Sequence, residues 1–575
     1  MKVTQVSKGF GHLLARVPDA SGWQLFASVF SVHLIVSLAV GEVAWDDGYI
    51  TLAFARTYAE TGHIGLTPFS ETVEGATSPL WFLLMAAIYK LGITSFYGFH
   101  LASQLIAAVC AATAAVLLYR LVRPSAPAAA WLIAFLALIL GPFRTETANG
   151  MEMTLLCVVV LWIMCFIRDQ KDQPLLGLML LSAVVPLVRF EAAGYLVVGA
   201  TGIMLFSKQI RVGLAIILST LSAMLLVTFV RYIIFGTLGL TNTMIAKQAS
   251  PYSPPFGTPA WNLQLVVGVL IEPIATFLPA LVVCFVLSRI SGVKMFDRMR
   301  ELANLATSRR MPARVSFALA YALAFIGVTV VLGSNYFAPP GRMGASALLA
   351  LIVAAAIAFP VKEKIKSVSR RTYAAVGALF LVPFVGILAQ DLAWFYIARL
   401  NTDTKLAFNS TVAYRENGEA ADHVRDLLQL PKVSVLVADV GATSLCCERL
   451  EILDLGLLAN RELSSSGWGG FAEYLRERKP DLIQTHGVWS QESEIYDNPD
   501  FKLNYTPVVV YDSLFYLRND HFDVLKTRCV DASTSEPYFY AGLEPASSRK
   551  DVMPADQIDK AYVDSLGLAN FCRLA

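Results

Sequence analysis

The sequence predicts an α-helical polytopic membrane protein that ends in a smaller α/β domain on the outer side of the membrane. Three observations predict this class. Of the 575 residues, 56% are hydrophobic and 16% are charged, whereas soluble domains carry about 25% charged residues. Apolar runs long enough to cross a bilayer recur through residues 1–395. In residues 400–575 the apolar runs become short and charges of both signs are interspersed.

About eleven apolar runs approach the length of a membrane span, for which roughly 20 residues cross the hydrocarbon. The first run follows Lys2, Lys8 and Arg16 and lacks a convincing small-residue cleavage site, so we interpret it as a retained anchor. The expected spans are residues 23–44, 97–119, 127–141, 151–167, 174–188, 190–207, 212–235, 262–288, 315–333, 343–360 and 372–392.

Residues 79–93 form a shorter apolar run that begins with proline and contains Lys90. If this run is a helix resting on the outer surface, all basic clusters fall on one side, which identifies that side as the cytoplasm. We therefore predict a cytoplasmic N-terminus, with the first loop and the C-terminal domain outside. The clusters are the N-terminus, Arg120 with Arg123, Arg168 with Lys171, Lys208 with Arg211, residues 294–314 and residues 362–371.

The C-terminal domain, residues 400–575, is predicted to alternate strands with helix. Apolar runs at 433–437, 482–483 and 507–511 are typical of buried strands, and residues 470–478 of a helix. The chain has eight cysteines. Cys110, Cys157, Cys165 and Cys284 lie in expected spans as packing residues, and Cys446, Cys447, Cys529 and Cys572 lie in the outer domain. The neighbouring Cys446 and Cys447 are not expected to bond each other, because so small a ring is strained. Each is expected to reach Cys529 or Cys572, in an order left open.

Asp46 and Asp47 follow the first span, ahead of residues 51–62, which we predict to be an amphipathic helix lying along the surface. A charge at a membrane boundary is costly unless it faces water or a cavity, so the pair is a functional candidate. The alternative is that it marks where the chain leaves the lipid. A net charge of +2 is too small to indicate a nucleic-acid partner. The absence of P-loop, GxGxxG and HExxH motifs argues against nucleotide-driven and zinc-protease classes.

Several basic residues fall on the outer side against the general bias. Each is either a solvated loop residue or a partner for a bound anion, and their convergence with few acids favours a phosphate site. A carboxylate that deprotonates an acceptor hydroxyl, beside cations that hold a leaving lipid phosphate, would suit an enzyme acting on a lipid-carried substrate. The bases are Arg56, Lys90, Arg144, Arg189, Arg231, Lys247 and Arg342, and the acids are Asp46, Asp47, Glu74, Glu152 and Glu191.

Short motifs occur in a set order along residues 45–485. They are Asp46-Asp47-Gly-Tyr-Ile, Phe54-Ala55-Arg56, residues 73–81 (VEGATSPLW), Gly150-Met151-Glu152, Arg189-Phe190-Glu191, residues 241–247 (TNTMIAK), residues 333–342, residues 437–442 (VADVGA) and residues 452–457 (ILDLGL). This order resembles the C-type glycosyltransferases that use polyprenyl-phosphate sugars, and within them the mycobacterial terminal arabinofuranosyltransferase (AftB-like) family. Phe190 and Thr241 stand where that family has prolines, and Asn335 where an acid is usual.

The resemblance implies a GT-C-like fold and an inverting transfer at the periplasmic face of a bacterial inner membrane. The sugar would be D-arabinofuranose on a decaprenyl-type phosphate, with mannose or an aminosugar as alternatives within the superfamily. Asp46 would be the general base and Asp47 its partner, although the residues alone do not separate them. No cofactor is required, and a divalent metal remains compatible with one acid pair but is not implied.

The substrate-binding candidates come from the outer basic residues, whose guanidinium groups can hold phosphate oxygens in a fork, and from the motifs above, and structural roles are their alternatives. Arg189, Lys247 and Arg342 are expected to hold the donor phosphate, with Arg56 and Arg231 behind them. The other candidates are Glu74, which would orient the acceptor or serve as a cap or turn acid; Glu152, which would bind a sugar hydroxyl or pair with Arg144; Glu191, which would pair with Arg189; and Asn242. Trp45 and Trp81 fit a sugar platform or, as we favour, an interfacial aromatic belt.

The acceptor is expected to be a glycan end or a protein such as a pilin. The outer domain would bind that acceptor, brace the spans or recognise a partner. From another class, the chain would be a lipid-carrier flippase or exporter without chemistry, for which ionisable groups near the middle of the membrane are expected.

Overall fold

The computed structural model describes residues 20–40, 46–127, 129–139, 142–167, 174–238, 242–246, 295–332, 344–360, 410–511, 513–531, 555–567 and 571–574. The expected spans at 262–288 and 372–392 lie outside the described residues. So do Trp45, Lys247, Cys284 and Arg342.

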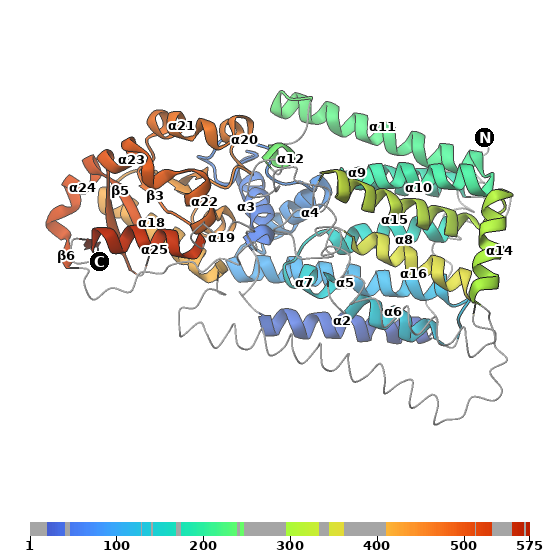
Figure 1. Ribbon diagram of the computed structural model, residues 1–575. Coiled ribbons are helices and arrows are strands. Elements are labelled where there is room, and N and C mark those ends of the chain that lie inside the picture. The colour runs from blue at the N-terminus through green and yellow to red at the C-terminus, as the bar shows by residue number, and fades with distance from the viewer. Residues whose placement is uncertain are drawn as a thin grey trace.

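Apolar helices build a bundle at one end of the molecule, and a sheet domain lies at the other end (Figure 1). Each predicted span within the described ranges contains a helix, although residues 127–141 correspond to a helix of only ten residues. Among the described residues, three helices are long and apolar enough to cross a membrane: α2 over Ala20–Leu38, α5 and α11. The bundle helices are α2 (Ala20–Val40), α5 (Phe96–Val122), α6 (Ala130–Ile139), α7 (Pro142–Ala148), α8 (Met153–Phe166), α9 (Leu175–Val188), α10 (Ala192–Ser207), α11 (Ile210–Phe235), α15 (Ala313–Leu332) and α16 (Ala345–Ala358).

Helices α5 and α11 illustrate how composition sorts helices between the centre and the edge of the bundle. Helix α5 is rich in alanine, which allows close helix packing, and Ala107, Ala111 and Ala115 are fully buried. Helix α11 instead carries leucines that project from the bundle, with Leu225 72% exposed. Such a surface is suited to lipid contact.

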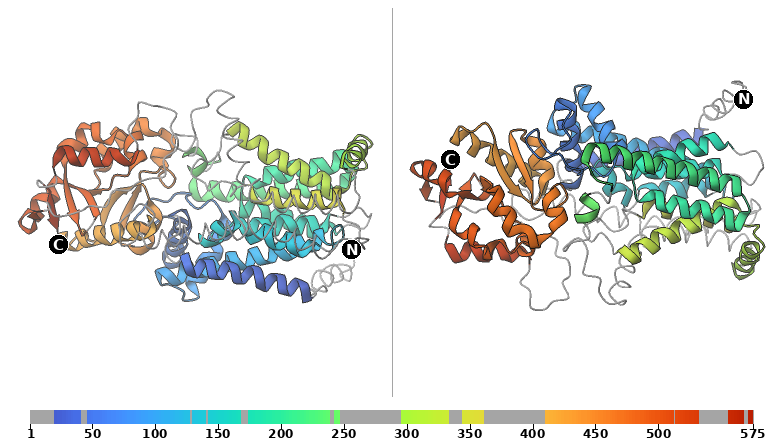
Figure 2. Two further views of the ribbon diagram at one scale, coloured as in Figure 1. Left: turned by 60° about the horizontal axis from the view of Figure 1, so that its bottom comes forward. Right: turned by 90° about the horizontal axis from the view of Figure 1, so that it is seen from above.

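Helix α14 (Met295–Thr307) crosses the end of the bundle that lies away from the sheet domain (Figures 1 and 2). Near it, three arginine Nε atoms donate to carbonyl oxygens at the C-terminal ends of other helices. Arg298 bonds Ala358 of α16, Arg309 bonds Leu205 of α10 and Arg314 bonds Ile167 after α8, each at 2.8 Å. Cations stabilise helix C-termini, where the partial charge is negative.

The C-terminal domain is built on a seven-stranded sheet in the order β2-β1-β3-β5-β4-β7-β6. Strand β1 pairs in parallel with both β2 and β3, while β5 runs antiparallel to β3 and β4. The predicted strands at 433–437, 482–483 and 507–511 and the predicted helix at 470–478 are confirmed as β1, β3, β4 and α21. The strands are β1 (Val433–Val437), β2 (Leu450–Asp454), β3 (Leu482–Ile483), β4 (Tyr505–Val510), β5 (Ser513–Arg518), β6 (Val530–Asp531) and β7 (Cys572–Leu574).

Helices cover this sheet and connect its strands. They are α18 (Ser410–Leu428), α19 (Val440–Cys446), α20 (Arg461–Ser466), α21 (Phe471–Arg478), α22 (Gly487–Glu492), α23 (Pro499–Asn504), α24 (Asn519–Leu525) and α25 (Ala555–Leu566). Helix α19 follows β1 directly, and it carries the domain's contact with the first outer loop described below.

The predicted disulfide pairing is wrong. Cys446 bonds its neighbour Cys447, and Cys529 bonds Cys572. The second bridge follows from sheet register, because β6 and β7 are antiparallel neighbours and place the segments that contain Cys529 and Cys572 side by side. The first lies where α19 ends and the backbone turns to an extended conformation at Cys447. Sequence spacing contains neither piece of information.

Helices α3 (Asp46–Thr61) and α4 (Pro79–Lys90) lie between the bundle and the sheet domain (Figures 1 and 2). The predicted helix at 51–62 is present within α3, and its position along the membrane surface stays a prediction. Tyr49, Phe54 and Ala55 are fully buried, because the sheet domain packs onto α3 through α19. Burial on both sides leaves little room around the helix.

Glycines make these close contacts of α3 feasible on its two sides. A Cβ atom at Gly48 would lie 2.3 Å from the carbonyl oxygen of Asn149, at the end of the bundle. A Cβ atom at Gly441 of α19 would lie 2.4 Å from the carbonyl oxygen of Asp46. Both obstacles are backbone atoms, which cannot rotate away.

Replacing Gly48 by alanine should therefore lower the free energy of unfolding by about 1–3 kcal/mol, as overpacking does. Gly194 is the matched control, since it is also the third residue of its helix and a Cβ atom there would meet nothing within 4 Å. Gly194→Ala should be neutral or stabilising. Thermal unfolding of the detergent-solubilised variants measures both effects, and equal stability of the two would contradict this packing.

A candidate active site between the bundle and the sheet domain

The acid pair occupies the first turn of α3, but its two members have different surroundings. Acids in a first helical turn face the positive end of the helix dipole. Asp46 is partly buried and Asp47 is exposed. The Oδ2 atom of Asp46 accepts the amide N–H of Gly441 at 2.7 Å, and its Oδ1 atom accepts the amide N–H of Ala442 at 2.8 Å. The Asp46 carboxylate thus caps the N-terminal end of α19.

Removal from water and the neighbouring Asp439 raise the pKa of Asp46 to about 8, against the lowering effect of the two amide hydrogen bonds. A carboxyl group near this value exchanges its proton close to neutral pH. Asp46 is therefore both a docking group and a titrating group.

Arg56 lies at the opposite end of the same contact. Its NH1 atom donates to the carbonyl oxygen of Leu445 at 2.8 Å, in the last turn of α19, and its Nε atom lies 3.9 Å from Glu60. Burial lowers the pKa of Arg56. Asp46 contacts the N-terminus of α19 and Arg56 contacts its C-terminus. Both charges therefore interact favourably with the helix dipole. Arg56 was expected behind the phosphate-binding residues. The structure places it instead at the contact between α3 and the sheet domain.

Two buried ion-pair clusters collect most of the other predicted residues. Arg189 contacts Glu152 through NH1 at 2.5 Å and Glu191 through Nε at 2.7 Å. The predicted Arg189–Glu191 pair is therefore present, and Glu152 has Arg189 as a partner, which the sequence did not indicate. Their side chains come from the turns that precede α8 and α10.

Glu74 and Arg231 form the second cluster. The Arg231 Nε atom lies 2.6 Å from Glu74 Oε1, and its guanidinium carbon lies 5.7 Å from the centre of the Phe190 ring. Burial raises the pKa of Glu74, and Arg231 opposes that rise. Since Phe190 stands between Arg189 and Glu191 in the chain, the two clusters adjoin. Together they hold three carboxylates and two guanidinium groups, so an incoming phosphate would have to displace a carboxylate.

The motif at 241–247 approaches the same place through α12 (Asn242–Ala246). The hydroxyl of Thr243 lies 3.4 Å from the carbonyl oxygen of Glu74 and 3.5 Å from that of Leu458 in the sheet domain. Asn242 begins α12. Trp81 is 1% exposed and donates from Nε1 to the carbonyl oxygen of Gly150 at 3.1 Å, so its assignment to an aromatic belt is wrong.

Sequence reasoning missed three polar residues that follow the parallel strands. Asp439 comes after β1, Asp454 ends β2 and His486 comes after β3. His486 Nδ1 lies 2.5 Å from Asp439 Oδ2. Asp454 accepts the amide N–H groups of residues 456 and 459, and burial raises its pKa to about 7. A usable signal was the acid at the end of each of these strands, Asp439 after residues 433–437 and Asp454 at the end of residues 450–454. Ligand sites of such sheets gather at the carboxyl ends of the strands.

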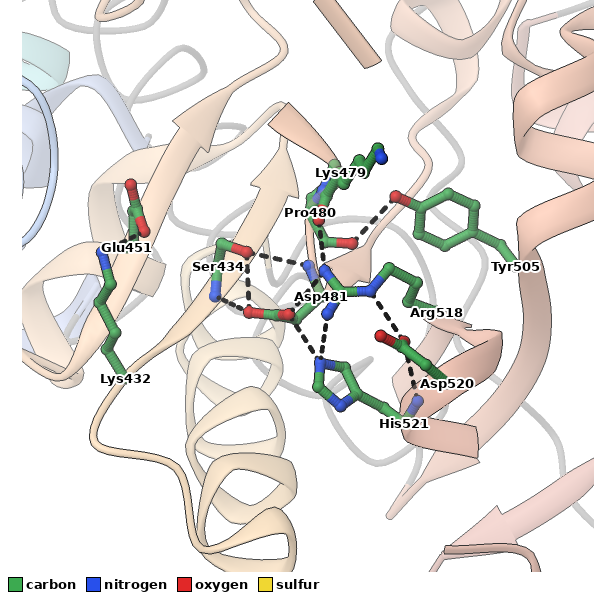
Figure 3. Close-up of polar contacts among 10 residues, drawn as sticks. All are labelled: Lys432, Ser434, Glu451, Lys479, Pro480, Asp481, Tyr505, Arg518, Asp520 and His521. Atoms are coloured by element: carbon green, nitrogen blue, oxygen red, sulfur yellow. Dashed lines mark hydrogen bonds and ion pairs between the residues drawn. The ribbon is translucent and has the colours of Figure 1, made fainter. Parts of the chain in front are cut away.

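The opposite end of the sheet has a polar cluster of another kind (Figure 3). Asp481 accepts the amide N–H of Ser434 at 2.8 Å and lies 2.7 Å from His521 Nε2 and 2.9 Å from Arg518 NH1. Although burial acts to raise it, the hydrogen bonds from His521 and Ser434 hold the pKa of Asp481 below its ordinary value. These partners all belong to the sheet domain. At the edge that carries Asp439, the sheet domain contacts the start of α3 through α19.

Within the described ranges, no three His, Cys, Asp or Glu side chains gather in a way that would hold a metal ion. Lys247 and Arg342 lie outside those ranges, so their expected contact with a donor phosphate stays a prediction.

Comparison with known proteins gives little direct information. No protein-family model matches the chain, and neither does any curated relative. Among solved structures, the chain is similar to the crystal structure of ArnT from Cupriavidus metallidurans in the apo state. The sequence identity is 15%, the alignment covers 87% of this chain and 98% of that chain, and the TM-score is 0.49.

Stability should depend on pH through Asp46. Its folded-state pKa of about 8 exceeds the ordinary value of 3.8, so between these values the native state retains a proton that the unfolded chain releases. Stability should therefore fall as pH rises from about 4 to 8. Asp46→Asn should reduce this slope, and the rest of it should persist through Asp454.

Melting temperatures measured from pH 5 to 8 test this expectation. Asp497→Asn is the control, because the Asp497 side chain is 88% exposed. A slope that is identical in wild type and Asp46→Asn would contradict the assigned environment of Asp46.

Glu74→Gln should destabilise the protein by about 3–5 kcal/mol, because it leaves Arg231 buried without its charged partner. The double variant Glu74→Gln/Arg231→Gln should be more stable than the summed single effects predict. Glu301→Gln is the control, because it removes an exposed partner of Arg298 and should cost about 0–1 kcal/mol. Additive effects at Glu74 and Arg231 would show that the pair is not coupled.

Proposed function

We propose that this protein is an inverting membrane glycosyltransferase that uses a polyprenyl-phosphate sugar. The observation that carries the proposal is the convergence of sequence-distant motifs on one place. Asp46 contacts the motif at 437–442, Gly48 packs against Asn149 beside the motif at 150–152, and Thr243 approaches both Glu74 and Leu458. Motifs that resemble one enzyme family in order thus also meet in space.

In the proposed reaction, an acceptor hydroxyl attacks the anomeric carbon of the sugar from the side opposite the lipid phosphate. The new carbon–oxygen bond forms, the bond to the phosphate oxygen breaks, and the electron pair leaves with the lipid phosphate. A carboxylate takes the hydroxyl proton. The exposed Asp47 is better placed to meet an acceptor than Asp46, both of whose oxygens accept amides of α19. We therefore assign the base to Asp47, which reverses the order expected from the resemblance.

The leaving phosphate requires cations, and we assign this role to Arg189 and Arg231, together with Lys247 and Arg342. The first two already adjoin at Phe190, where a phosphate would replace part of the negative charge that Glu74 and Glu191 now supply. Guanidinium groups suit this role because they hold phosphate oxygens in a fork. D-arabinofuranose is the first candidate sugar, on the resemblance alone.

The orientation forms part of the same proposal: a bacterial inner membrane, a cytoplasmic N-terminus and a periplasmic sheet domain. The basic end of the bundle supports it, because Arg298, Arg309 and Arg314 lie there and basic residues favour the cytoplasmic side. A flippase without chemistry is the alternative from another class. The acids and bases of the motifs gather beside the sheet domain rather than around the middle of the bundle, which favours the enzyme.

Incubation of the purified protein with synthetic prenyl-phosphate sugars tests the function. Release of free lipid phosphate with an arabinofuranosyl donor, but not with mannosyl or aminosugar donors, is the expected result. Glycan ends and pilin-like peptides would be compared as acceptors. Passage of the lipid across a vesicle membrane without release of phosphate would instead identify a flippase.

Asp47→Asn should lower the rate of phosphate release by about 10²–10⁴-fold while the melting temperature stays near wild type, because a general base contributes that much. Asp46→Asn should change the melting temperature as well as the rate. Full activity of Asp47→Asn would show that Asp47 is not the general base. Full activity of the double variant Asp46→Asn/Asp47→Asn would show that neither aspartate is.

A further inference from the structure

The first outer loop contacts the sheet domain through two acids in the same manner. Asp46 accepts the amides at the start of α19, and the Oε1 atom of Glu71 accepts the amide N–H of Arg461, the first residue of α20, at 2.8 Å. Hydroxyls of the same loop reach β2, since Thr67 donates to the Leu450 carbonyl oxygen at 2.6 Å and Ser70 accepts the Ile452 amide at 3.1 Å. The two acids differ in one respect, because only Asp46 adjoins the proposed base.

We infer that helix α19 of the sheet domain is a positioning element for the acid pair, so that Gly441, Ala442 and Asp439 act on the reaction through Asp46. This inference rests on the proposed function. It assigns the outer domain a part in the chemistry beyond bracing the bundle.

The contacts of α3 with α19 restrain the acid pair. Both carboxylate oxygens of Asp46 accept amide hydrogen bonds from α19, and its backbone is in close contact with Gly441. At the C-terminal end of α19, Arg56 donates to the carbonyl oxygen of Leu445. The start of α3 therefore has little freedom to rotate. Successive side chains on a helix point about 100° apart, so fixing Asp46 also fixes the direction of Asp47. A reactive group displaced by about 1 Å can lose 10²-fold in rate.

Groups of the sheet domain also act on the protonation of Asp46. The groups that act on the Asp46 carboxyl are its neighbour Asp47 on α3, the two amides of α19 and Asp439 at the N-terminal cap position of α19. Asp439 in turn contacts His486, beyond which stands Asp559. The amides favour the carboxylate form of Asp46, and the Asp439 charge disfavours it. The sheet domain therefore holds two opposed controls on the proton of Asp46.

Two substitutions separate these controls. Ala442→Pro deletes the N–H that Asp46 Oδ1 accepts, and proline is tolerated in the first turn of a helix. Asp439→Asn keeps the size of the side chain and removes its charge. The inflection of the pH–rate profile that reports Asp46, expected near its pKa of about 8, should move upward in Ala442→Pro and downward in Asp439→Asn.

Ala442→Pro should also lower kcat about 10- to 100-fold, on the scale of a misplaced group, with little change in the KM for the donor. Arg461→Pro is the matched control. It deletes the amide that Glu71 accepts, at the first position of α20, where proline is favoured. This control should loosen the docking of the two domains but leave kcat within about twofold of wild type and the inflection in place.

Equal losses of kcat in Ala442→Pro and Arg461→Pro, without movement of the inflection, would show that α19 only docks and would overturn the inference. If Ala442→Pro does not fold, Asp439→Asn decides alone, since an unmoved inflection also overturns it. Should wild type release no lipid phosphate from any donor, the proposed function fails by itself. Infrared titration of the Asp46 carboxyl band, assigned with Asp46→Asn, then tests the opposite shifts without activity.

Discussion

The structure depends on one contact: a carboxylate of the first outer loop receives the amide groups that begin a helix in the sheet domain. Both Asp46 oxygens are used, and Arg56 meets the carbonyl end of the same helix. The contact is feasible because Gly48 and Gly441 remove the Cβ atoms that would hold α3 away from the bundle and α19 away from α3. A larger residue at Gly48 would strain the contact of α3 with the bundle, and one at Gly441 would strain the contact of α19 with α3.

Charge is distributed along the molecule in two ways that share one physical cause. Beside the sheet domain, carboxylates meet helix N-termini and guanidinium groups. At the far end, arginines meet the C-terminal carbonyl groups of α8, α10 and α16. Unsatisfied backbone groups at helix ends are costly when buried, and charged side chains satisfy them more strongly than neutral ones. The same requirement thus supports both the fold and the orientation proposed for the protein.

The sequence predicted elements better than it predicted partners. Apolar runs identify α5, α11, β1 and β3 because their patterns depend on length and burial, which are local properties. Pairing depends on which turns the fold brings together, and sequence order does not contain this. Arg189 therefore takes Glu152 as well as the expected Glu191, and Cys529 takes Cys572 through sheet register. Trp81 was assigned to the interface by residue type, whereas it is 1% exposed and bonds the carbonyl oxygen of Gly150.

The position of Asp46 also bears on what the sheet domain is for. Sheets with parallel strands bind ligands at the carboxyl ends of those strands, with anions at helix N-termini. Here the amides at the start of α19 and α20, which follow β1 and β2, are directed at carboxylates of the first outer loop. This chain therefore supplies its own anions to positions where a separate binding domain would hold a ligand. Under the proposed function, the sheet domain would form the second half of one site, and the acceptor would bind where the two halves meet.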